Sequence, residues 1–365
     1  MKKKVLILIT RGEVGGAQTF AINLAKGLTD KGYLVTVGFG QEGGYLKQES
    51  VRNKIPTVQF PGLARGFNIF KIYQFVQNFR KFLNNNNFDV LHLNSSNTIF
   101  AAMAARLAHK KPKIVFTVHG LSYLDANAQK NKIIKLAVYF VYKFLFKFID
   151  EIIFVCRANL EYAQKIKLVS KGEIIYNGVN SEFKEKIQTL NFLEEKLGIE
   201  LTGKKIVGSI GRLAYPKNYD FLIKAASGMQ LSNTVFIIIG DGPLRQKYQK
   251  MINKLGIQNI FYLAGEITKA ETYLLAFNVF VLVSEYEGLP LTLLSALRAE
   301  IPVLASNVGG VSEVLPSLSE LYQKNNINEF SKKLKLLLAS KTKKIRREGF
   351  TVSKMVDAYS QLYNL

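Results

Sequence analysis

Short apolar runs alternate with helical patterns along almost the whole chain of 365 residues, and this alternation limits the possible folds more than any other feature. Such runs are typical of strands buried on both faces of a parallel sheet, each followed by a helix that crosses over to the next strand. Apolar residues make up 48% of the sequence, which is enough for two cores, and a polar stretch at 181–203 separates the runs into two sets. We therefore expect an α/β protein with two doubly wound domains, residues 1–180 and 181–349. The predicted strands are Val5–Thr10, Leu34–Phe39, Val90–Leu93, Ile114–Val118, Glu151–Val155, Lys205–Ile210, Val235–Ile239, Ile260–Leu263, Val279–Val283 and Val303–Ala305.

The stretch 279–315 indicates a ligand site in the second of these domains. Its apolar run Val279–Val283 leads into a polar loop that carries Glu287, and a helical pattern follows at Leu291–Ala299. Loops and helix N-termini meet at the carboxyl ends of parallel strands, where free backbone N–H groups bind anions. A carboxylate in the same loop accepts hydrogen bonds from hydroxyls. A ligand with both hydroxyls and phosphates, such as a nucleotide-sugar, fits this combination.

The run EYEGLPLTLLSALRAEIPVLASNVGG resembles the donor-binding signature of the retaining glycosyltransferases of family four, which have the GT-B fold. That signature carries two glutamates separated by seven residues. Glu287 matches the first, and Ser295 stands where the second belongs. By this resemblance, the first glutamate meets the donor sugar, the second holds the ribose, and Gly288, Leu289, Pro290 and Leu291 line the donor. Serine is shorter and uncharged, so the ribose contact is the one that the departure puts in question.

A second match to the family follows the run Lys205–Ile210, where the sequence reads GRLAYPKN. The shared pattern is glycine followed by arginine, here Gly211 and Arg212, and then a lysine five positions on, Lys217. A departing nucleoside diphosphate requires cations that stabilise the charge developing as the glycosidic bond breaks. Taken alone, the two cations would be interpreted as surface residues of a basic protein. With the match, Arg212 and Lys217 are the leading catalytic candidates, together with Glu287.

Glycine turns follow two other predicted strands. Gly15 and Gly16 open a helical pattern after the first strand, and Gly240 follows Val235–Ile239. Glycine allows a ligand to approach the backbone closely, but the first pair lacks the spacing of a dinucleotide motif, and a tight turn without a ligand is the alternative. In the resembling family the glycine pair faces the donor phosphates, and the segment that includes Ile267 holds the nucleobase through its backbone.

The histidines and the single cysteine favour neither a metal site nor a disulfide. The chain has 3 histidines, Cys156 as its one cysteine, and no Asp-x-Asp pair, so neither a catalytic Mg²⁺ or Mn²⁺ nor another cofactor is expected. His119 ends the run Ile114–Val118, at a place where a side chain projects from a sheet edge. A lone histidine is more often structural, but the family places one in this context beside the donor sugar, and His119 is therefore a catalytic candidate. His92 receives no role.

The charge of the chain is +23 and is concentrated in the first half. Residues 1–180 contain 26 Lys and Arg against 10 Asp and Glu, whereas residues 181–365 contain 24 against 17. An anionic partner such as membrane headgroups, lipid phosphate or nucleic acid would explain this, and a solvated lysine-rich surface is the alternative. No aromatic RNA-binding motif or basic recognition helix favours nucleic acid.

The segment Lys130–Ile149 indicates which anionic partner to expect. At 100° per residue, four of its lysines, at 132, 135, 143 and 147, fall within one arc of about 120°, and the other positions from 133 to 149 are apolar or aromatic. These lysines argue against a membrane-spanning helix, and a helix that lies in the membrane interface fits the pattern. A core helix with its lysines in water is the alternative. The expected membrane contacts are Lys132, Lys135, Lys143 and Lys147.

The resemblance extends from Gly15 to the last helical pattern, 350–365. It implies two Rossmann-like domains that face each other across a cleft, with residues 350–365 crossing back to the first domain. The first domain would bind the acceptor and the second a UDP- or GDP-linked sugar. The implied reaction transfers a hexosyl unit, with retention, to a hydroxyl of a lipid-linked glycan.

The expected location is the cytoplasmic face of the membrane, as a peripheral protein. The single cysteine fits a reducing compartment, and the short first apolar run fits a strand better than a signal peptide. Two other functions stay open. One is a nucleotide-sugar epimerase of the same fold, which would not require a membrane helix. The other is a basic membrane-binding protein without catalytic activity.

Overall fold

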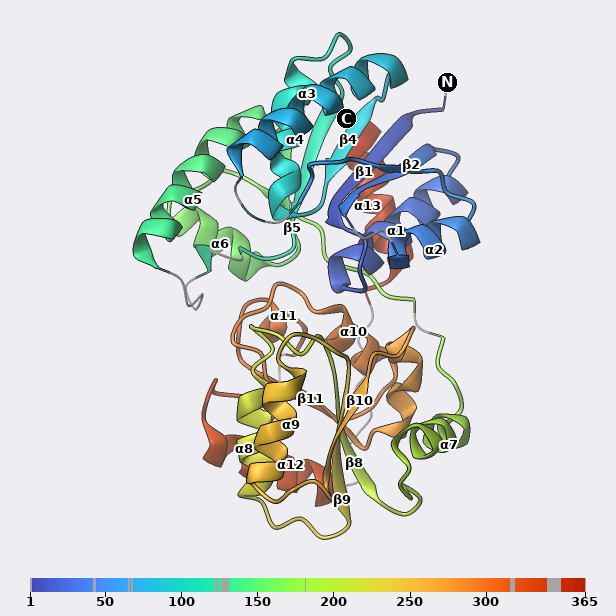
Figure 1. Ribbon diagram of the computed structural model, residues 1–365, viewed down its shortest axis with the longest axis vertical. Coiled ribbons are helices and arrows are strands. Elements are labelled where there is room, and N and C mark those ends of the chain that lie inside the picture. The colour runs from blue at the N-terminus through green and yellow to red at the C-terminus, as the bar shows by residue number, and fades with distance from the viewer. Residues whose placement is uncertain are drawn as a thin grey trace. The chain divides into compact units, whose positions relative to one another are not determined.

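The computed structural model describes residues 2–41, 44–64, 66, 68–121, 124–125, 131–180, 182–315, 319–339 and 349–364. The chain forms two compact units, of which unit 1 comprises Met1–Gly178 with Phe350–Leu365 and unit 2 comprises Val179–Gly349 (Figure 1). Each unit contains one parallel sheet with its own helices.

Unit 1 is built on a seven-stranded sheet in the order β3-β2-β1-β4-β5-β6-β7, and all of its pairings are parallel. The chain starts in the middle of the sheet, moves to one edge, and returns to continue on the other side. This order confirms the predicted doubly wound fold. The strands are β1 (Lys4–Arg11), β2 (Leu34–Gln41), β3 (Thr57–Gln59), β4 (Val90–Leu93), β5 (Lys113–Val118), β6 (Glu151–Phe154) and β7 (Glu173–Ile174).

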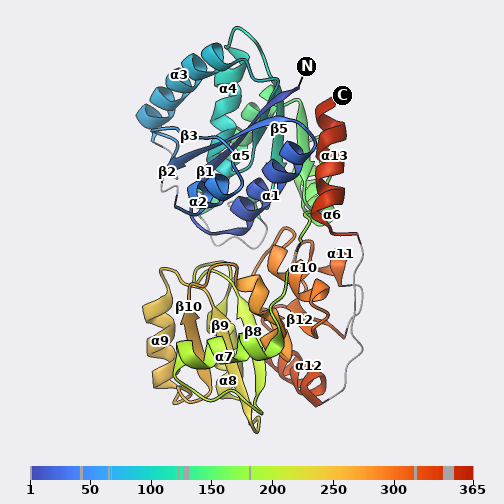
Figure 2. The ribbon, with the colours of Figure 1, turned by 90° about the vertical axis from the view of Figure 1, so that its right-hand side faces the viewer.

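Helices cover both faces of this sheet, and each face has its own apolar core. One core is formed with α3 (Ile69–Asn86), α4 (Phe100–Arg106), α5 (Lys132–Leu145) and α6 (Arg157–Lys165). The other is formed with α1 (Gly16–Asp30), α2 (Gly44–Arg52) and α13 (Val352–Asn364), as Figure 2 shows for α1 and α13. Two short 3-10 helices, η1 (Ser96–Ile99) and η3 (Phe146–Phe148), precede α4 and follow α5.

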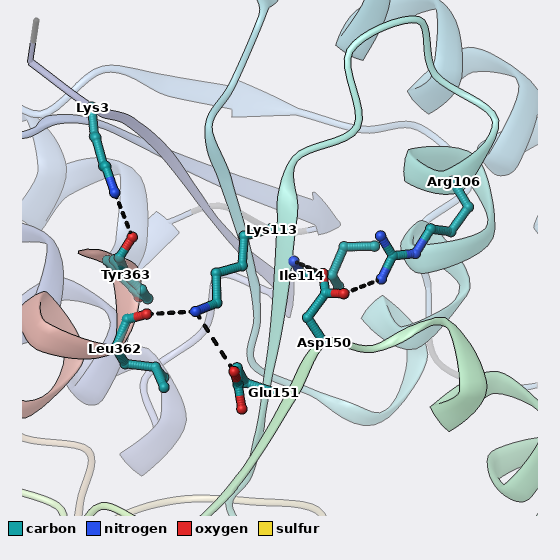
Figure 3. Close-up of polar contacts among 8 residues, drawn as sticks. All are labelled: Lys3, Arg106, Lys113, Ile114, Asp150, Glu151, Leu362 and Tyr363. Carbon is teal, nitrogen blue, oxygen red and sulfur yellow. Dashed lines mark hydrogen bonds and ion pairs between the residues drawn. The ribbon is translucent and has the colours of Figure 1, made fainter. Parts of the chain in front are cut away.

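The C-terminal helix α13 belongs to unit 1, as predicted. Its apolar residues recur at helical spacing and are buried against α1, where a Cβ added to Gly27 would lie 2.5 Å from Val356 Cγ2. Two lysines close its C-terminus: Lys113 Nζ donates to Leu362 O over 2.7 Å, and Lys3 Nζ donates to Tyr363 O over 2.8 Å (Figure 3). Cations at this position interact favourably with the last carbonyls and the helix dipole.

Unit 2 contains a six-stranded parallel sheet in the order β10-β9-β8-β11-β12-β13. Its strands are β8 (Lys205–Ile210), β9 (Thr234–Ile239), β10 (Phe261–Gly265), β11 (Val279–Leu282), β12 (Val303–Ser306) and β13 (Leu321–Tyr322). Its helices are α7 (Lys186–Leu197), α8 (Tyr219–Ser227), α9 (Arg245–Lys254), α10 (Leu291–Arg298), α11 (Val311–Val314) and α12 (Ile327–Ala339), with the 3-10 helix η4 (Ala270–Ala276). The strand order again confirms a doubly wound unit.

The structure differs from the expectations at short or terminal elements. The strands β3, β7 and β13 were not predicted, because two or three residues are too few to show a period. The helix expected over Lys130–Ile149 is shorter: α5 ends at Leu145 and the chain continues as η3, which contains Lys147. Residue 130 lies outside the described residues.

Candidate active site

The strand order of unit 2 identifies the place where a ligand is expected. Strands β8 and β11 are neighbours in the sheet, although β9 and β10 come between them in sequence. The connections after β8 and β11 therefore leave in opposite directions, and open α/β sheets bind ligands at the carboxyl ends of such a pair. The first of these loops carries Lys217 and the second carries Glu287.

Lys217 and Glu287 form an ion pair at this position. Lys217 Nζ lies 2.6 Å from Glu287 Oε1, and Ser284 Oγ donates to the same oxygen over 2.6 Å. The side chains of Lys217 and Glu287 are only 22% and 13% exposed. Taking two charges out of water is unfavourable unless they are well paired, and such pairs in a ligand-binding position are candidates for function. The sequence match thus concerns two residues that the fold brings into contact.

The backbone around Glu287 is fixed by neighbouring loops. Glu285 N donates to Pro216 O over 2.8 Å, which joins the two loops, and Gly310 N donates to Gly288 O over 3.0 Å. Gly309 has a φ of +51°, and a Cβ there would lie 1.9 Å from Glu287 O. A larger residue would therefore displace the Glu287 backbone.

The side chain of Lys217 also lies close to the backbone of neighbouring glycines. A Cβ added to Gly211 would lie 3.4 Å from Lys217 Cε, so the lysine stem passes close over this glycine. Gly240 has a φ of +144°, and its Cβ would lie 2.1 Å from Gly211 O. The predicted residues Gly211, Lys217 and Gly240 thus lie together, and Arg212 is exposed on the same loop.

Helix α10 starts directly after the Glu287 loop. Gly288, Leu289 and Pro290 are buried and Leu291, its first residue, is half-buried. Ser295 lies in the second turn with 3% of its surface exposed. Ile267 is also buried and follows β10, two strands away from β8. The structure therefore gathers Gly288 and the start of α10 beside Glu287, whereas Ile267 lies farther along the sheet edge.

His119 lies at the carboxyl end of β5 in unit 1, and Asn94 follows the neighbouring strand β4. Asn94 Nδ2 donates to His92 O over 3.3 Å, which turns Asn94 Oδ1 toward His119 Nε2 at 3.4 Å. An amide oxygen only accepts, so the proton of a neutral His119 ring must reside on Nε2. The ring also packs edge-on against Phe20, with centroids 4.6 Å apart, and loss of hydration lowers the pKa of His119 to about 4. His119 is thus a neutral ring whose Nδ1 can accept a hydrogen bond.

His92 is part of a buried polar network that could not be found from the sequence. Its Nε2 lies 2.7 Å from Thr117 Oγ1, and its Nδ1 lies 2.5 Å from Tyr363 Oη. Thr117 Oγ1 in turn lies 2.8 Å from Tyr359 Oη. Burial lowers the pKa of His92 well below its usual value. The network ties α13 to β4 and β5, and its partners are up to 271 residues apart in sequence.

Gly15 and Gly16 lie at the same carboxyl edge of the unit 1 sheet, where β1 connects to α1. Gly15 is the N-cap of α1, and a Cβ there would lie 2.6 Å from Gln18 Oε1. Gln18 Nε2 donates to Arg11 O over 3.0 Å, which fixes the turn. Gly16 has no neighbouring atom within 4 Å of an added Cβ. The turn is therefore held by local contacts at Gly15.

The lysines expected to contact a membrane differ in their exposure to solvent. Lys132, Lys143 and Lys147 are exposed, whereas Lys135 is half-buried and donates from Nζ to Asp125 O over 3.3 Å. Lys143 Nζ donates to Tyr139 Oη over 3.1 Å. In the described part of the chain, no helix combines the length and apolarity required to span a membrane. The same residues contain no group of three or more His, Cys, Asp or Glu that could hold a metal ion.

Comparisons with known proteins agree with this architecture. The family described as Glycosyltransferase Family 4 matches residues 14–183, and the family described as Glycosyl transferases group 1 matches residues 192–350. The chain therefore belongs to the glycosyltransferases of family four, and its two doubly wound units are those of the GT-B fold.

Three similar proteins show how far the likeness extends. An Escherichia coli UDP-Gal:alpha-D-GlcNAc-diphosphoundecaprenol alpha-1,3-galactosyltransferase is 29% identical over 325 residues, covering 83% of this chain and 82% of that protein. The O-antigen biosynthesis glycosyltransferase WclY of Escherichia coli is 22% identical and covers 76% of this chain and 79% of its own length. The structure of Anabaena HepE in complex with UDP and glucose has a TM-score of 0.77 at 20% identity, covering 99% of this chain and 95% of HepE.

Proposed function

We propose that the protein is a retaining, metal-independent glycosyltransferase that moves a hexosyl unit from a UDP- or GDP-linked sugar to a lipid-linked glycan. Unit 2 binds the donor, and unit 1 binds the acceptor. The observation that carries the proposal is the pairing of Lys217 with Glu287 at the strand pair β8 and β11. An ammonium group binds a diphosphate and a carboxylate binds sugar hydroxyls, so one small site contains a partner for each part of a nucleotide-sugar.

The chemistry assigned to this pair follows from where charge develops. When the bond between the anomeric carbon and the diphosphate oxygen breaks, its electron pair stays on the diphosphate. Lys217 and Arg212 stabilise that added negative charge. Glu287 accepts hydrogen bonds from donor hydroxyls and, in the free protein, holds the ammonium of Lys217 in position through a contact of 2.6 Å.

Retention requires that the acceptor oxygen reaches the anomeric carbon from the face that the diphosphate leaves. The acceptor hydroxyl forms the new bond, and its proton passes to an oxygen of the departing diphosphate. This route requires no carboxylate as nucleophile, in contrast to a double displacement at two carboxyl groups about 5 Å apart. In unit 1, neutral His119 accepts a hydrogen bond from a sugar hydroxyl through Nδ1.

Two observations support a lipid-linked acceptor at a membrane surface. The similar Escherichia coli galactosyltransferase acts, by its name, on a diphosphoundecaprenol-linked sugar. Helix α5 exposes Ile133, Phe140 and Phe144 by 76%, 60% and 52%, next to the exposed lysines Lys132 and Lys143. An exposed stripe of apolar and cationic side chains fits a helix that lies in the interface of an anionic membrane. Such a contact would keep the acceptor-binding unit at the cytoplasmic face, as part of polysaccharide synthesis.

The test is a transfer assay with UDP-, GDP- and ADP-linked hexoses and a diphospholipid-linked N-acetylglucosamine, with and without EDTA. We expect one donor, UDP-galactose being the first to try, to give a product whose new bond has the anomeric configuration of the donor by NMR. Loss of activity in EDTA would contradict metal independence, and an inverted bond would contradict retention.

The same assay separates the two alternative functions. A nucleotide-sugar epimerase would consume the donor without acceptor and release a free sugar. A membrane-binding protein without catalytic activity would leave every donor intact while it still sediments with anionic vesicles. Either result would overturn the proposed transfer reaction.

A further inference from the structure

The first five residues of α3 expose three large apolar side chains. Ile69, Phe70 and Tyr73 are 80%, 86% and 65% exposed. Apolar residues scattered singly on a surface are ordinary, but three within five residues of one helix form a patch of the kind that marks an interaction site. The patch needs an explanation because folding unit 1 does not require it.

The rest of α3 shows why the core does not need these residues. The helix buries Phe75, Val76, Phe79 and Leu83, which form one face at helical spacing and pack in the core of unit 1. Its start is fixed by Asn68, whose side chain accepts a hydrogen bond from Lys71 N over 3.0 Å. The helix is thus capped and packed without Ile69, Phe70 and Tyr73, which face outward.

The charge around the patch indicates the chemistry of its partner. In the sequence, no Asp or Glu occurs between Glu49 and Asp89. The same interval contains six cations, of which Lys71, Arg80 and Lys81 lie on α3. An apolar patch within a purely cationic segment suits a surface that offers anionic headgroups outside and hydrocarbon inside. The remaining cations are Arg52, Lys54 and Arg65.

The position of α3 in the fold agrees with such a surface. Helices α3, α4 and α5 all contribute to the core on one face of the unit 1 sheet, and they lie in one layer in Figure 1. Both α3 and α5 run from the carboxyl edge of the sheet toward the amino edge, so their first turns are at the same edge. The exposed residues of α3 and α5 therefore belong to one side of one unit.

We infer that the N-terminal end of α3 is a second membrane contact, which inserts Ile69, Phe70 and Tyr73 into an anionic bilayer while Lys71 meets the headgroups. This inference rests on the proposed membrane location and extends it, because the contact made by α5 does not require the α3 patch. Two contacts on one side would define the orientation of unit 1 on the membrane, whereas one helix would leave it free to rotate about that helix.

The absence of tryptophan from the sequence allows a direct test in the full-length protein. Phe70→Trp places a single fluorescent reporter in the α3 patch, and Phe140→Trp places one on α5. Leu336→Trp, at a residue of unit 2 that is 60% exposed, is the matched control. Each variant is mixed with vesicles of anionic lipid that contain brominated acyl chains and no glycan carrier, and with neutral vesicles of the same chain composition.

We expect Phe70→Trp and Phe140→Trp to shift to shorter emission wavelengths and to be quenched by the anionic brominated vesicles, whereas Leu336→Trp stays unchanged. Phe70→Ser in the otherwise native chain should weaken partitioning into these vesicles roughly tenfold, because one buried aromatic side chain is lost. Leu336→Ser should leave partitioning unchanged.

An unquenched Phe70→Trp in vesicles that quench Phe140→Trp would overturn the inference and leave the contact by α5 standing. An emission shift of Phe70→Trp without vesicles, growing with protein concentration, would overturn it in favour of a second copy of this chain as the partner. The transfer assay on the native protein is independent of these signals, so failure of the proposed reaction is recognised separately.

Discussion

The two units share the order of six strands, to which unit 1 adds β7, but they differ in the chemistry of their carboxyl edges. In unit 2 this edge holds the ion pair Lys217–Glu287. In unit 1 the corresponding edge holds the ion pair Arg11–Glu13 after β1 and, at β4 and β5, neutral groups. These are His119, with a pKa of about 4, Asn94, and the hydroxyls of Thr10 and Ser95, which lie 2.6 Å apart. The two doubly wound sheets thus provide the same backbone geometry, and the residues at their strand ends determine which kind of ligand each unit can bind.

Unit 1 also has ordered charges at the opposite edge of the sheet. Lys113 lies 3.6 Å from Glu151, and Asp150 accepts hydrogen bonds from Arg106 Nη2 over 2.6 Å and from Ile114 N over 2.8 Å (Figure 3). These charges join strand starts to neighbouring segments and have a structural role. The contrast suits a division of labour in which unit 2 stabilises a charged diphosphate and unit 1 orients uncharged hydroxyls.

The largest expected effect is on the charged edge. Lys217→Ala should lower kcat/KM about 10²- to 10³-fold, because the developing charge on the leaving group loses a stabilising cation. Glu287→Gln should also lower kcat/KM, because the contacts to donor hydroxyls are weakened and Lys217 is no longer held in position by a carboxylate. Lys250→Ala on α9 and Glu195→Gln on α7, both at exposed residues, are the matched controls. Activity close to native in Lys217→Ala would contradict the site.

The stability of other variants at the same two residues should separate pairing from catalysis. Removing one partner, as in Lys217→Met, leaves a mostly buried charge and should lower the free energy of unfolding by about 1–3 kcal/mol. The double variant with Glu287→Leu should regain most of this loss and still be inactive. Urea unfolding of the three proteins checks this. A double variant less stable than the single one would show that the pair itself stabilises unit 2.

The neutral His119 at the carboxyl edge of unit 1 should make stability depend on pH. The folded pKa of His119, about 4, lies below the ordinary value of 6.5, so the unfolded state binds more protons between these values. The contribution of His119 is therefore complete above pH 6.5 and is lost as pH falls toward 4. Between pH 7 and pH 5 we expect a loss of about 1–2 kcal/mol.

Burial of His92 acts in the same direction. Urea titrations at the two pH values check the effect, and the pH dependence should shrink in His119→Asn. A histidine C2 proton of residue 119 that titrates near pH 6.5 by NMR would contradict a neutral His119.

Asn94 should affect the reaction through His119. Asn94→Leu removes the hydrogen-bond acceptor for Nε2–H of His119, so the ring is no longer held in one tautomer. We therefore expect kcat/KM to fall roughly tenfold, as for loss of one oriented hydrogen bond. Asn94→Asp keeps an acceptor but adds a charge that raises the pKa of His119, and should move the acidic limb of the pH–rate profile to higher pH. An unchanged profile in Asn94→Asp would show that Asn94 only fills space.

The smallest expected effect concerns the network that holds α13. Tyr359→Phe removes the hydroxyl that lies 2.8 Å from Thr117 Oγ1 and should lower the free energy of unfolding by about 1 kcal/mol without changing KM for the donor. Denaturant midpoints and steady-state kinetics check the two parts. A large rise in donor KM would show that α13 contributes to the site as well as to the fold.

The fold could be predicted from the sequence to a large extent, because long buried strands leave an unambiguous apolar pattern. Val279–Val283 and Lys205–Ile210, for example, were predicted within one residue of β11 and β8. Strand β3, with three residues, has no such pattern and depends on its pairing with β2. The end of α5 at Leu145 also depends on tertiary packing, since the lysine periodicity continues to Lys147.

The candidate site was predictable only where a family motif marks it. Lys217 and Glu287 were identified from two motifs, and the fold shows that residues 70 positions apart are in contact. The roles of Ser284 and Asn94 were missed, because single polar residues after a strand are common. One signal was available for Asn94: it directly follows a predicted strand, as His119 does. His92 had none, since its partners lie on β5 and α13.

The most direct test of the account is a thermal-shift comparison of native protein, Lys217→Ala and Lys250→Ala with UDP, GDP and ADP. A ligand that binds only the folded state stabilises it, by about 2.7 kcal/mol at a concentration one hundred times Kd, and therefore raises Tm. We predict that one nucleotide raises the Tm of the native protein and of Lys250→Ala but not that of Lys217→Ala. An equal rise in Lys217→Ala, or no rise with any nucleotide in folded native protein, would contradict the assignment of the charged edge of unit 2 as a diphosphate site.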